Sequence, residues 1–278
     1  MKLRYAVPTP LDYFSTLVQS DEGFPLLEAA ASLAQDEHPG LDMQQVLDEV
    51  DQLQARLRRR LAPDAPALQR LHVLNRFFYT DLGFGGNVNH YYDPENSYLS
   101  TVLRTRRGIP ITLAVLWLEL AQGAGLKVHG VAFPGHFLVK VLLPAGQALL
   151  DPFTGRSLSR EELEERLEPF QRTVFSQEDV PLGLYLQAAA PREIIARMLR
   201  NLKEVHQAQQ DWERLLAVQE RLVRLLPQAW IEWRDRGLAN AECGYVTAAV
   251  ADLELYLTHA DEEPDCTRIR ERLALLRP

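Results

Sequence analysis

The chain has 278 residues, of which 46% are hydrophobic and 24% are charged, ordinary proportions for a protein that folds into one large or two modest globular domains. Its 38 acidic and 30 basic side chains give a formal net charge of -8, which disfavours non-specific attraction to nucleic acid or to an anionic membrane. The N-terminus has no apolar core of signal-peptide length, and the longest apolar run, residues 109–121, contains Thr112 and Glu119. We therefore expect a cytoplasmic protein that binds neither nucleic acid nor membrane.

Residues 1–80 predict a helical lead-in. Apolar side chains recur there at intervals of three and four residues, which is the spacing of one face of an α-helix. The pattern is present in three stretches, FPLLEAAASLAQDEH (24–38), MQQVLDEVDQLQARL (43–57) and PALQRLHVLNRFFYT (66–80).

Residues 83–98, GFGGNVNHYYDPENSY, predict a loop, because glycine, asparagine and aspartate favour turns. Val88 stands where the phosphate-binding pattern GxGxxG requires its third glycine, and no Gly-Lys-Ser/Thr follows.

The two cysteines, Cys243 and Cys266, have no cysteine or histidine at metal spacing and are expected to be reduced thiols. We therefore expect no cofactor and no metal. The end of the loop leads into an expected short helix, PENSYLSTVLR (94–104).

Residues 110–122 predict a helix at the centre of a core, because they are apolar on almost every side. Gly123 and Gly125 are expected to end this helix. Short runs rich in β-branched and apolar residues follow and predict antiparallel strands joined by turns. These runs are LKVHGVAF (126–133), HFLVKVLL (136–143) and QALL (147–150). A helix followed by a meander of strands indicates an α+β domain.

From about residue 183 the pattern is wholly helical and repeats. Two stretches each give helix, break, helix and proline, and their breaks at 211–212 and 244–245 lie 33 residues apart. This period resembles that of tetratricopeptide repeats, which is about 34 residues. Arg236 and Asn240 depart from the repeat pattern, because they stand at positions that are usually apolar or aromatic. A plain helical cap on the first domain remains the alternative interpretation.

We expect two domains. Residues 1–182 form the first, with the helical lead-in at 1–80 and the α+β core at 81–182. Residues 183–278 form an all-α, tetratricopeptide-like tail of two helical hairpins and a final helix.

Three features of residues 107–151 follow one another in a recognisable order: a glycine before a buried helix, a histidine on a following strand, and an aspartate that ends a later strand. This order resembles the transglutaminase-like branch of the papain-type cysteine hydrolases. In that family a thiol at the helix N-terminus gives its proton to the histidine, which the aspartate orients. The resemblance assigns these roles to His136 in PGHFLVKV and Asp151 in LLDPF. The alternative is that His136 is a structural side chain and Asp151 fixes a turn.

Pro110 stands where the resemblance places the cysteine. Gly108 before it keeps a landmark of the family helix, but proline offers neither a nucleophile nor a backbone N–H. On this register covalent cysteine catalysis is excluded. The hydroxyls of Thr112 and Ser97 are the alternative nucleophiles, although a hydroxyl requires more activation than a thiol. Thr112 is also a candidate binding residue.

Nearly the whole chain is similar to the bacterial SirB family, transglutaminase-like proteins named for an invasion regulator. The resemblance is carried by the repeat-like tail and by the runs NSYL (96–99), RRGIPITL (106–113) and PGHFLVK (134–140). It implies a transglutaminase-like core without the standard thiol, with helical repeats behind it.

The loop before the central helix is a second candidate for a binding surface. Asn87, Tyr91, Tyr92 and Asn96 bring amides and phenols into ten residues, enough for a polar pocket or a peptide-binding rim. The alternative is a loop that only fixes turns and packs its rings on the core. Arg107 is a candidate clamp for a carboxylate, with a solvated charge as the alternative.

Two hypotheses of function follow. The first is a non-catalytic regulatory or interaction protein that binds a protein or peptide partner, because Pro110 replaces the nucleophile and helical hairpins commonly present a concave binding face. The second is a hydrolase or acyltransferase that uses His136 and Asp151 with a hydroxyl or water as the nucleophile. A third possibility is that the first domain only supports the repeats. The sequence leaves the partner and the oligomeric state open.

Overall fold

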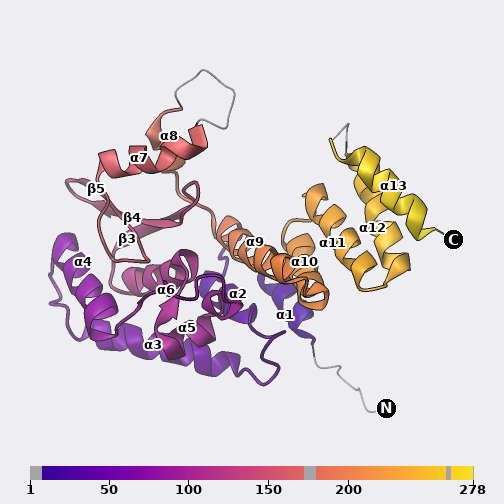
Figure 1. The fold of residues 1–278 in the computed structure, drawn as a ribbon. Helices are drawn as coiled ribbons and strands as arrows, with labels where there is room; N and C mark the ends of the chain where they lie inside the picture. Colours follow the sequence, from indigo (N-terminus) through magenta and orange to yellow (C-terminus); the bar gives the residue numbers. More distant parts are fainter. Residues whose placement is uncertain (1–7, 172–179, 261–263, 278) are drawn as a thin grey trace, which may run out of the picture.

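The structure is a computed structural model that describes residues 8–171, 180–260 and 264–277 (Figure 1). It combines a layer of N-terminal helices, a small antiparallel sheet and a helical tail, which confirms the expected α+β core with an all-α tail. The last helices of the tail extend away from the first domain (Figure 1). No helix in the described ranges is long and apolar enough to cross a membrane.

The N-terminal residues form the helices that the apolar periodicity predicts, together with one earlier helix, α1. Thr9 is the N-cap of α1: its hydroxyl accepts a hydrogen bond from the Asp12 N–H, and the Asp12 carboxylate accepts one from the Thr9 N–H. The helices are α1 (Pro10–Leu17), α2 (Leu26–Ser32), α3 (Met43–Arg58) and α4 (Ala67–Asn75), which a π-helical turn (Arg76–Asp81) continues.

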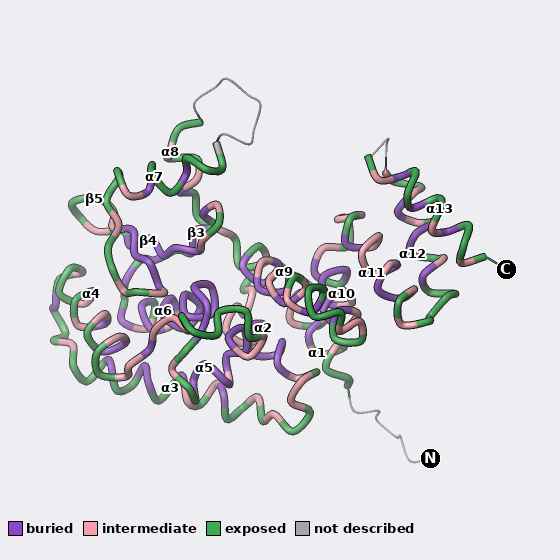
Figure 2. Tube along the Cα trace, in the orientation of Figure 1, coloured by how far each residue is buried: buried purple, intermediate pink, exposed green. Residues whose placement is uncertain are grey.

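Helix α6 (Pro110–Gly123) lies at the centre of the first domain, with 11 of its 14 residues buried (Figure 2). Helices α2, α3, α4 and α5 (Leu99–Thr105) and the sheet cover it on all sides. The Trp117 indole is fully buried, and its N–H donates to Oδ1 of Asn75 at 3.0 Å, so the one polar atom of this side chain is satisfied. The helix ends as expected, because Gly125 takes a φ of +76°, a conformation that favours glycine.

The predicted meander forms a three-stranded antiparallel sheet in the order β3-β4-β5. In β4, Val139 and Val141 face the core around α6, whereas Leu138 faces a second apolar cluster with Leu163 and Leu167 of α7. The sheet is therefore buried on both faces. The elements are β3 (Lys127–Val131), β4 (Leu138–Leu143), β5 (Gly146–Leu150), α7 (Arg160–Gln171) and α8 (Leu182–Tyr185).

Three chain segments meet at the N-terminus of α6. Strand β1 (Gly85–Gly86) of the glycine-rich loop pairs in parallel with β2 (Arg107–Gly108), which leads into the helix. The Gly86 N–H donates to the carbonyl of Phe153, in the turn after β5, at 3.0 Å. A Cβ added at Gly86 would lie 2.2 Å from the Phe153 ring, so only glycine allows this close approach. The packing fixes the loop, the helix entry and the turn relative to one another.

The tail consists of two helical hairpins and a final helix, as predicted. The first break is capped by Asp211, whose side chain accepts a hydrogen bond from the Arg214 N–H at 3.2 Å, and the second contains Gly244 at a φ of +79°. The helices are α9 (Pro191–Gln209), α10 (Trp212–Leu225), α11 (Trp230–Glu242), α12 (Val246–His259) and α13 (Cys266–Leu276).

Helices α9 and α10 attach the tail to the first domain. Helix α9 packs on α2 and on a 3-10 helix (Pro94–Ser97), and α10 packs on α1. Between α9 and α11, the fully buried carboxylate of Glu232 accepts hydrogen bonds from Arg200 at 2.9 Å and Lys203 at 2.8 Å. This ion-paired contact fixes the second hairpin to the helix that touches the first domain.

Arg236 and Asn240, the polar departures from the repeat pattern, share one acceptor on the facing helix. Arg236 donates two hydrogen bonds to the Asp252 carboxylate, at 2.7 and 2.6 Å, and the Asn240 amide donates a third at 3.2 Å. The Asp252 side chain is buried, so a polar network replaces the apolar contact usual at these positions.

Replacing Asp252 with alanine is expected to lower the free energy of unfolding by about 2–3 kcal/mol, because Arg236 and Asn240 would lose their buried acceptor. Urea denaturation followed by circular dichroism measures the loss. Glu254→Ala is the matched control on the same helix: Glu254 pairs with Arg277 at the surface, where such pairs contribute about 1 kcal/mol or less. Equal losses in the two variants would contradict the role assigned to the network.

Candidate functional site

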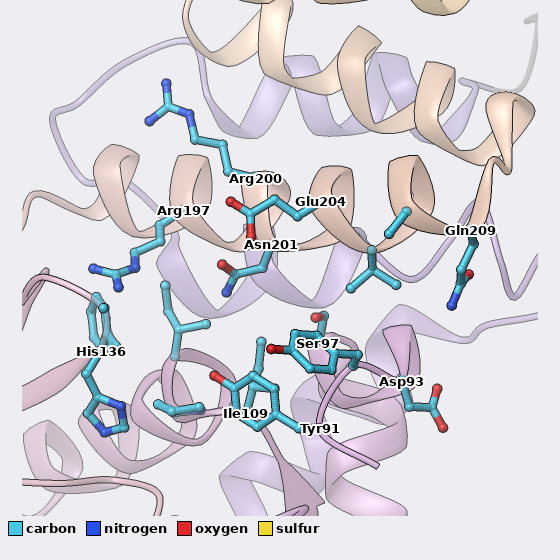
Figure 3. Close-up of a pocket in the computed structure, with 17 residues that line it drawn as sticks. Tyr91, Asp93, Ser97, Ile109, His136, Arg197, Arg200, Asn201, Glu204 and Gln209 are labelled. Carbon is cyan, nitrogen blue, oxygen red and sulfur yellow. The ribbon is translucent and has the colours of Figure 1, made fainter.

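A cavity of about 620 Å³ lies between the first domain and helix α9 (Figure 3). Its walls come from four segments: the tyrosines of the 83–98 loop, the N-terminus of α6, the turn before β4, and one face of α9. Pro110 and His136 both line it. The cavity is therefore the place where the residues of the predicted site meet the tail.

His136 and Asp151 form a hydrogen-bonded pair at the edge of the sheet. The Nε2 atom of His136 lies 2.8 Å from Oδ1 of Asp151. Their proximity follows from the antiparallel pairing of Val139 with Leu150, because His136 comes shortly before β4 and Asp151 directly after β5. Gly135, at a φ of +67°, makes the turn that leads the chain to His136.

The Asp151 carboxylate is held in its ionised form. Burial raises the pKa of Asp151, but the hydrogen bond and charge of His136, the N–H of Phe153 and the guanidinium of Arg166 together bring that pKa below its usual value. The Phe153 N–H lies 2.9 Å from Oδ1, and Arg166 lies 3.6 Å from Oδ2. The ionised carboxylate accepts the proton on Nε2, so in a neutral imidazole the lone pair is on Nδ1. Within the described residues, no hydrogen bond engages Nδ1.

Pro110 is the first residue of α6 and lies in the cavity wall with His136. The N-terminus of a helix carries positive dipole charge that stabilises anions. Proline, however, supplies neither a nucleophilic atom nor an N–H to bind an oxyanion. The arrangement thus contains an oriented imidazole and a helix N-terminus without a thiol between them.

The two hydroxyls considered as replacement nucleophiles lie in different places. Ser97 lines the cavity at the end of the 3-10 helix. Thr112 is fully buried two residues into α6, does not line the cavity, and has no hydrogen-bond partner for Oγ1 among the described residues. Of the two, only Ser97 is placed to meet a ligand in the cavity.

The polar loop divides into residues that shape it and residues that reach the cavity. The Asn96 amide donates to the carbonyls of His90 at 2.6 Å and Tyr91 at 3.2 Å, and its oxygen accepts from Asn87 at 2.9 Å. Asn87 and Asn96 therefore fix the loop and do not line the cavity. Tyr91 and Tyr92 do line it, with their rings edge to face at 5.2 Å.

Arg107 lies outside the cavity. Its Nη1 donates to the carbonyls of Gly83 and Arg106, and its side chain holds the start of the glycine-rich loop against β2. The Arg107 guanidinium, predicted as a clamp for a ligand carboxylate, is thus hydrogen-bonded to backbone carbonyl oxygens.

Comparison with known proteins finds two family models along the chain. A family model described as the transglutaminase-like superfamily matches residues 44–200, and a tetratricopeptide repeat model matches residues 202–274. A UPF0162 protein of Xylella fastidiosa strain Temecula1 is 38% identical over 85% of this chain and 84% of its own length. The chain belongs to the transglutaminase-like superfamily and to the UPF0162 family.

Other relatives extend this result. A UPF0162 protein of Pseudomonas aeruginosa is 31% identical over 91% of this chain and 91% of its own length. UPF0162 protein YchA of Escherichia coli K12 is 28% identical over 83% of this chain and 84% of its own length. Among solved structures, menin resembles 94% of this chain and 72% of its own chain, with a TM-score of 0.42 and 11% sequence identity.

Helix α9 contributes a wall of the cavity that the sequence analysis did not predict. Arg197, Asn201, Glu204 and Ala208 all line it. Their spacing of four, three and four residues is that of one helix face, the signal that was available in the sequence. Because three of these four side chains are polar or charged, the face does not stand out as a buried apolar stripe.

The Asp151 carboxylate is expected to stabilise the fold in a pH-dependent way. Its folded-state pKa lies below the ordinary value of 3.8, so its contribution is complete above that value and is lost as the pH falls through the folded-state pKa. The wild-type protein is expected to be more stable than Asp151→Asn near neutral pH, with the difference shrinking below about pH 4. Urea denaturation of both proteins over this pH range measures the difference, and a constant difference would contradict the assignment.

Pro110→Cys is expected to create a reactive thiol, because the α6 N-terminus and His136 both favour the thiolate. At about pH 6 the introduced thiol should react with iodoacetamide at least about tenfold faster than Cys243, whose thiol pKa is raised by burial. Adding His136→Ala should slow the reaction. Mass spectrometry of the labelled peptides follows both sites in one sample. An introduced thiol no faster than Cys243 would mean that position 110 is not aligned with His136.

Proposed function

We propose that this UPF0162 protein is a non-catalytic, SirB-type regulatory or interaction protein of the cytoplasm, whose cavity and helical tail together hold a polypeptide partner. In this proposal residues 1–182 are the transglutaminase-like domain and residues 183–278 the repeat tail. The observation that carries it is Pro110 at the head of α6, in the wall of the cavity that contains His136.

The cavity lining supports polypeptide binding. Ile109, Ile111 and Phe137 provide apolar surface, and Tyr91 and Tyr92 add rings with hydroxyl groups. Sites that bind peptides or small ligands commonly combine such apolar and aromatic surface with a few fixed polar groups. Burial raises the pKa of Tyr91, so its hydroxyl keeps its proton and can donate to a ligand.

The tail supports the same conclusion. Tetratricopeptide repeats generally mediate protein–protein interaction, and their stacked hairpins form extended binding surfaces. The first helix of the tail, α9, is also one wall of the cavity. A partner bound in the cavity therefore touches both parts of the chain.

A hydrolase or acyltransferase is the second candidate function. The pairing of His136 Nε2 with the ionised Asp151 favours it, because this arrangement leaves Nδ1 as a base for water or for a hydroxyl nucleophile. Pro110 weighs against it, because acyl transfer also requires donors for the oxyanion and proline removes one at the helix N-terminus.

A pool of random octapeptides, passed over the immobilised full-length protein, distinguishes the candidates. We expect peptides to be retained with unchanged masses, and His136→Ala to reduce retention about tenfold. His129→Ala is the matched control, because His129 is exposed on β3 and is expected to leave retention unchanged.

Two other outcomes would overturn the proposal. Cleaved or acyl-transferred peptides that disappear with His136→Ala would establish the enzyme. Retention that is unaffected by His136→Ala would assign binding to the repeats, with the first domain as a support.

A further inference from the structure

Arg197 differs from the other cationic side chains of the tail that face the first domain. It projects from α9 into the cavity wall and is half-buried. Its Nη1 donates to the carbonyl of Phe133 at 3.0 Å, and its guanidinium carbon lies 5.8 Å from the centre of the Phe137 ring. Both contacts are with uncharged groups, and no carboxylate of the described residues forms an ion pair with it.

Arg200, the second guanidinium at the cavity, is already neutralised. Its Nη2 lies 2.8 Å from Oε1 of Glu232, a carboxylate that is 1% exposed and that also accepts from Lys203. Figure 3 shows the two arginines pointing in different directions: Arg197 descends toward the segment of His136, whereas the side chain of Arg200 runs toward the opposite side of α9. Of the two arginines, Arg197 is therefore the one whose guanidinium has no carboxylate partner among the described residues.

The surroundings of Arg197 fix the position of its guanidinium but leave most of its N–H donors without an acceptor among the described residues. A guanidinium has five N–H donors in a planar fork, and the Phe133 carbonyl takes one of them. Burial lowers the pKa of Arg197, while Tyr91 and Glu204 act in the opposite direction at longer range. Glu204 is exposed two helical turns further along α9 and makes no ion pair with Arg197. The free edge of the fork has the geometry that binds a carboxylate through two parallel hydrogen bonds.

Resting on the polypeptide binding proposed above, we propose that Arg197 binds the C-terminal carboxylate of the partner chain, whose last residues occupy the cavity. A volume of about 620 Å³ suits a ligand of drug size, which corresponds to a few residues. A chain end fits such a space better than a segment that must enter and leave it. Capture of a terminal carboxylate is a recurring mode of peptide recognition. The apolar surface of Ile109, Ile111 and Phe137 and the rings of Tyr91 and Tyr92 receive the terminal side chains.

Three random octapeptide pools test the source of the carboxylate. The first lacks Asp and Glu and has a free C-terminus, the second is the same pool with a C-terminal amide, and the third is amidated but contains Asp and Glu. We expect the immobilised full-length protein to retain the first pool at least about tenfold more than the other two, because the charge-assisted pair is lost with the terminal carboxylate. Equal retention of the first and third pools would mean a side-chain carboxylate and would overturn the assignment to a chain end.

Arg197→Gln should reduce retention of the first pool about 10- to 100-fold, and Arg197→Lys, which keeps the charge but not the fork, should give an intermediate loss. Arg192→Gln is the matched control on the same helix, expected to leave retention nearly unchanged because Arg192 does not line the cavity and pairs with Asp21. Thermal unfolding of each variant verifies that it is folded.

The experiment distinguishes a failure of the proposed role of Arg197 from a failure of the proposed polypeptide binding. Retention of all three pools to the same extent would reject the role of Arg197 and leave peptide binding intact. Retention of no pool by the wild-type protein would reject both the binding of polypeptides by this cavity and the role of Arg197.

Discussion

The first domain depends on one constraint, which is that α6 is apolar on almost every side and must be covered on every side. The N-terminal helices and the sheet supply that cover. At the N-terminus of α6 the layers meet, and the contact of Gly86 with Phe153 brings their backbones together. The candidate site lies at this meeting point, so its residues come from segments that are distant in sequence. The same packing that buries α6 thus positions His136, Asp151 and the tyrosines.

The elements around α6 were predictable because their signals are local. An apolar helix and β-branched runs separated by turns are visible in short windows, and the pairing of β4 with β5 then places His136 beside Asp151. The separation of Ser97 from Thr112 was not predictable. In a helix that is apolar all round, no polar face indicates which side chain turns toward a cavity, and only the packed structure shows that Thr112 is enclosed.

The contribution of α9 to the cavity wall could not be predicted from the sequence, for a different reason. Arg197, Asn201 and Glu204 are charged or polar, and such a helix face is normally solvated. Its contact with the cavity depends on how α9 docks on α2 and on the 3-10 helix, which is a tertiary effect. The loop asparagines show the same limit, because composition marks Asn87 and Asn96 as polar but only the backbone path decides that they bond each other. The sequence showed which side chains are polar or charged, but it did not show the direction in which each of them points.

The matches to the transglutaminase-like and tetratricopeptide models meet at residues 200 and 202, inside the continuous helix α9. The single helix α9 therefore belongs to both regions: its first half carries Arg197, and the second hairpin is fixed to it through Glu232. Deleting the residues matched by the repeat model would remove part of the cavity wall. Conversely, a displacement of the repeats would move a wall of the cavity, because both are attached to this shared helix.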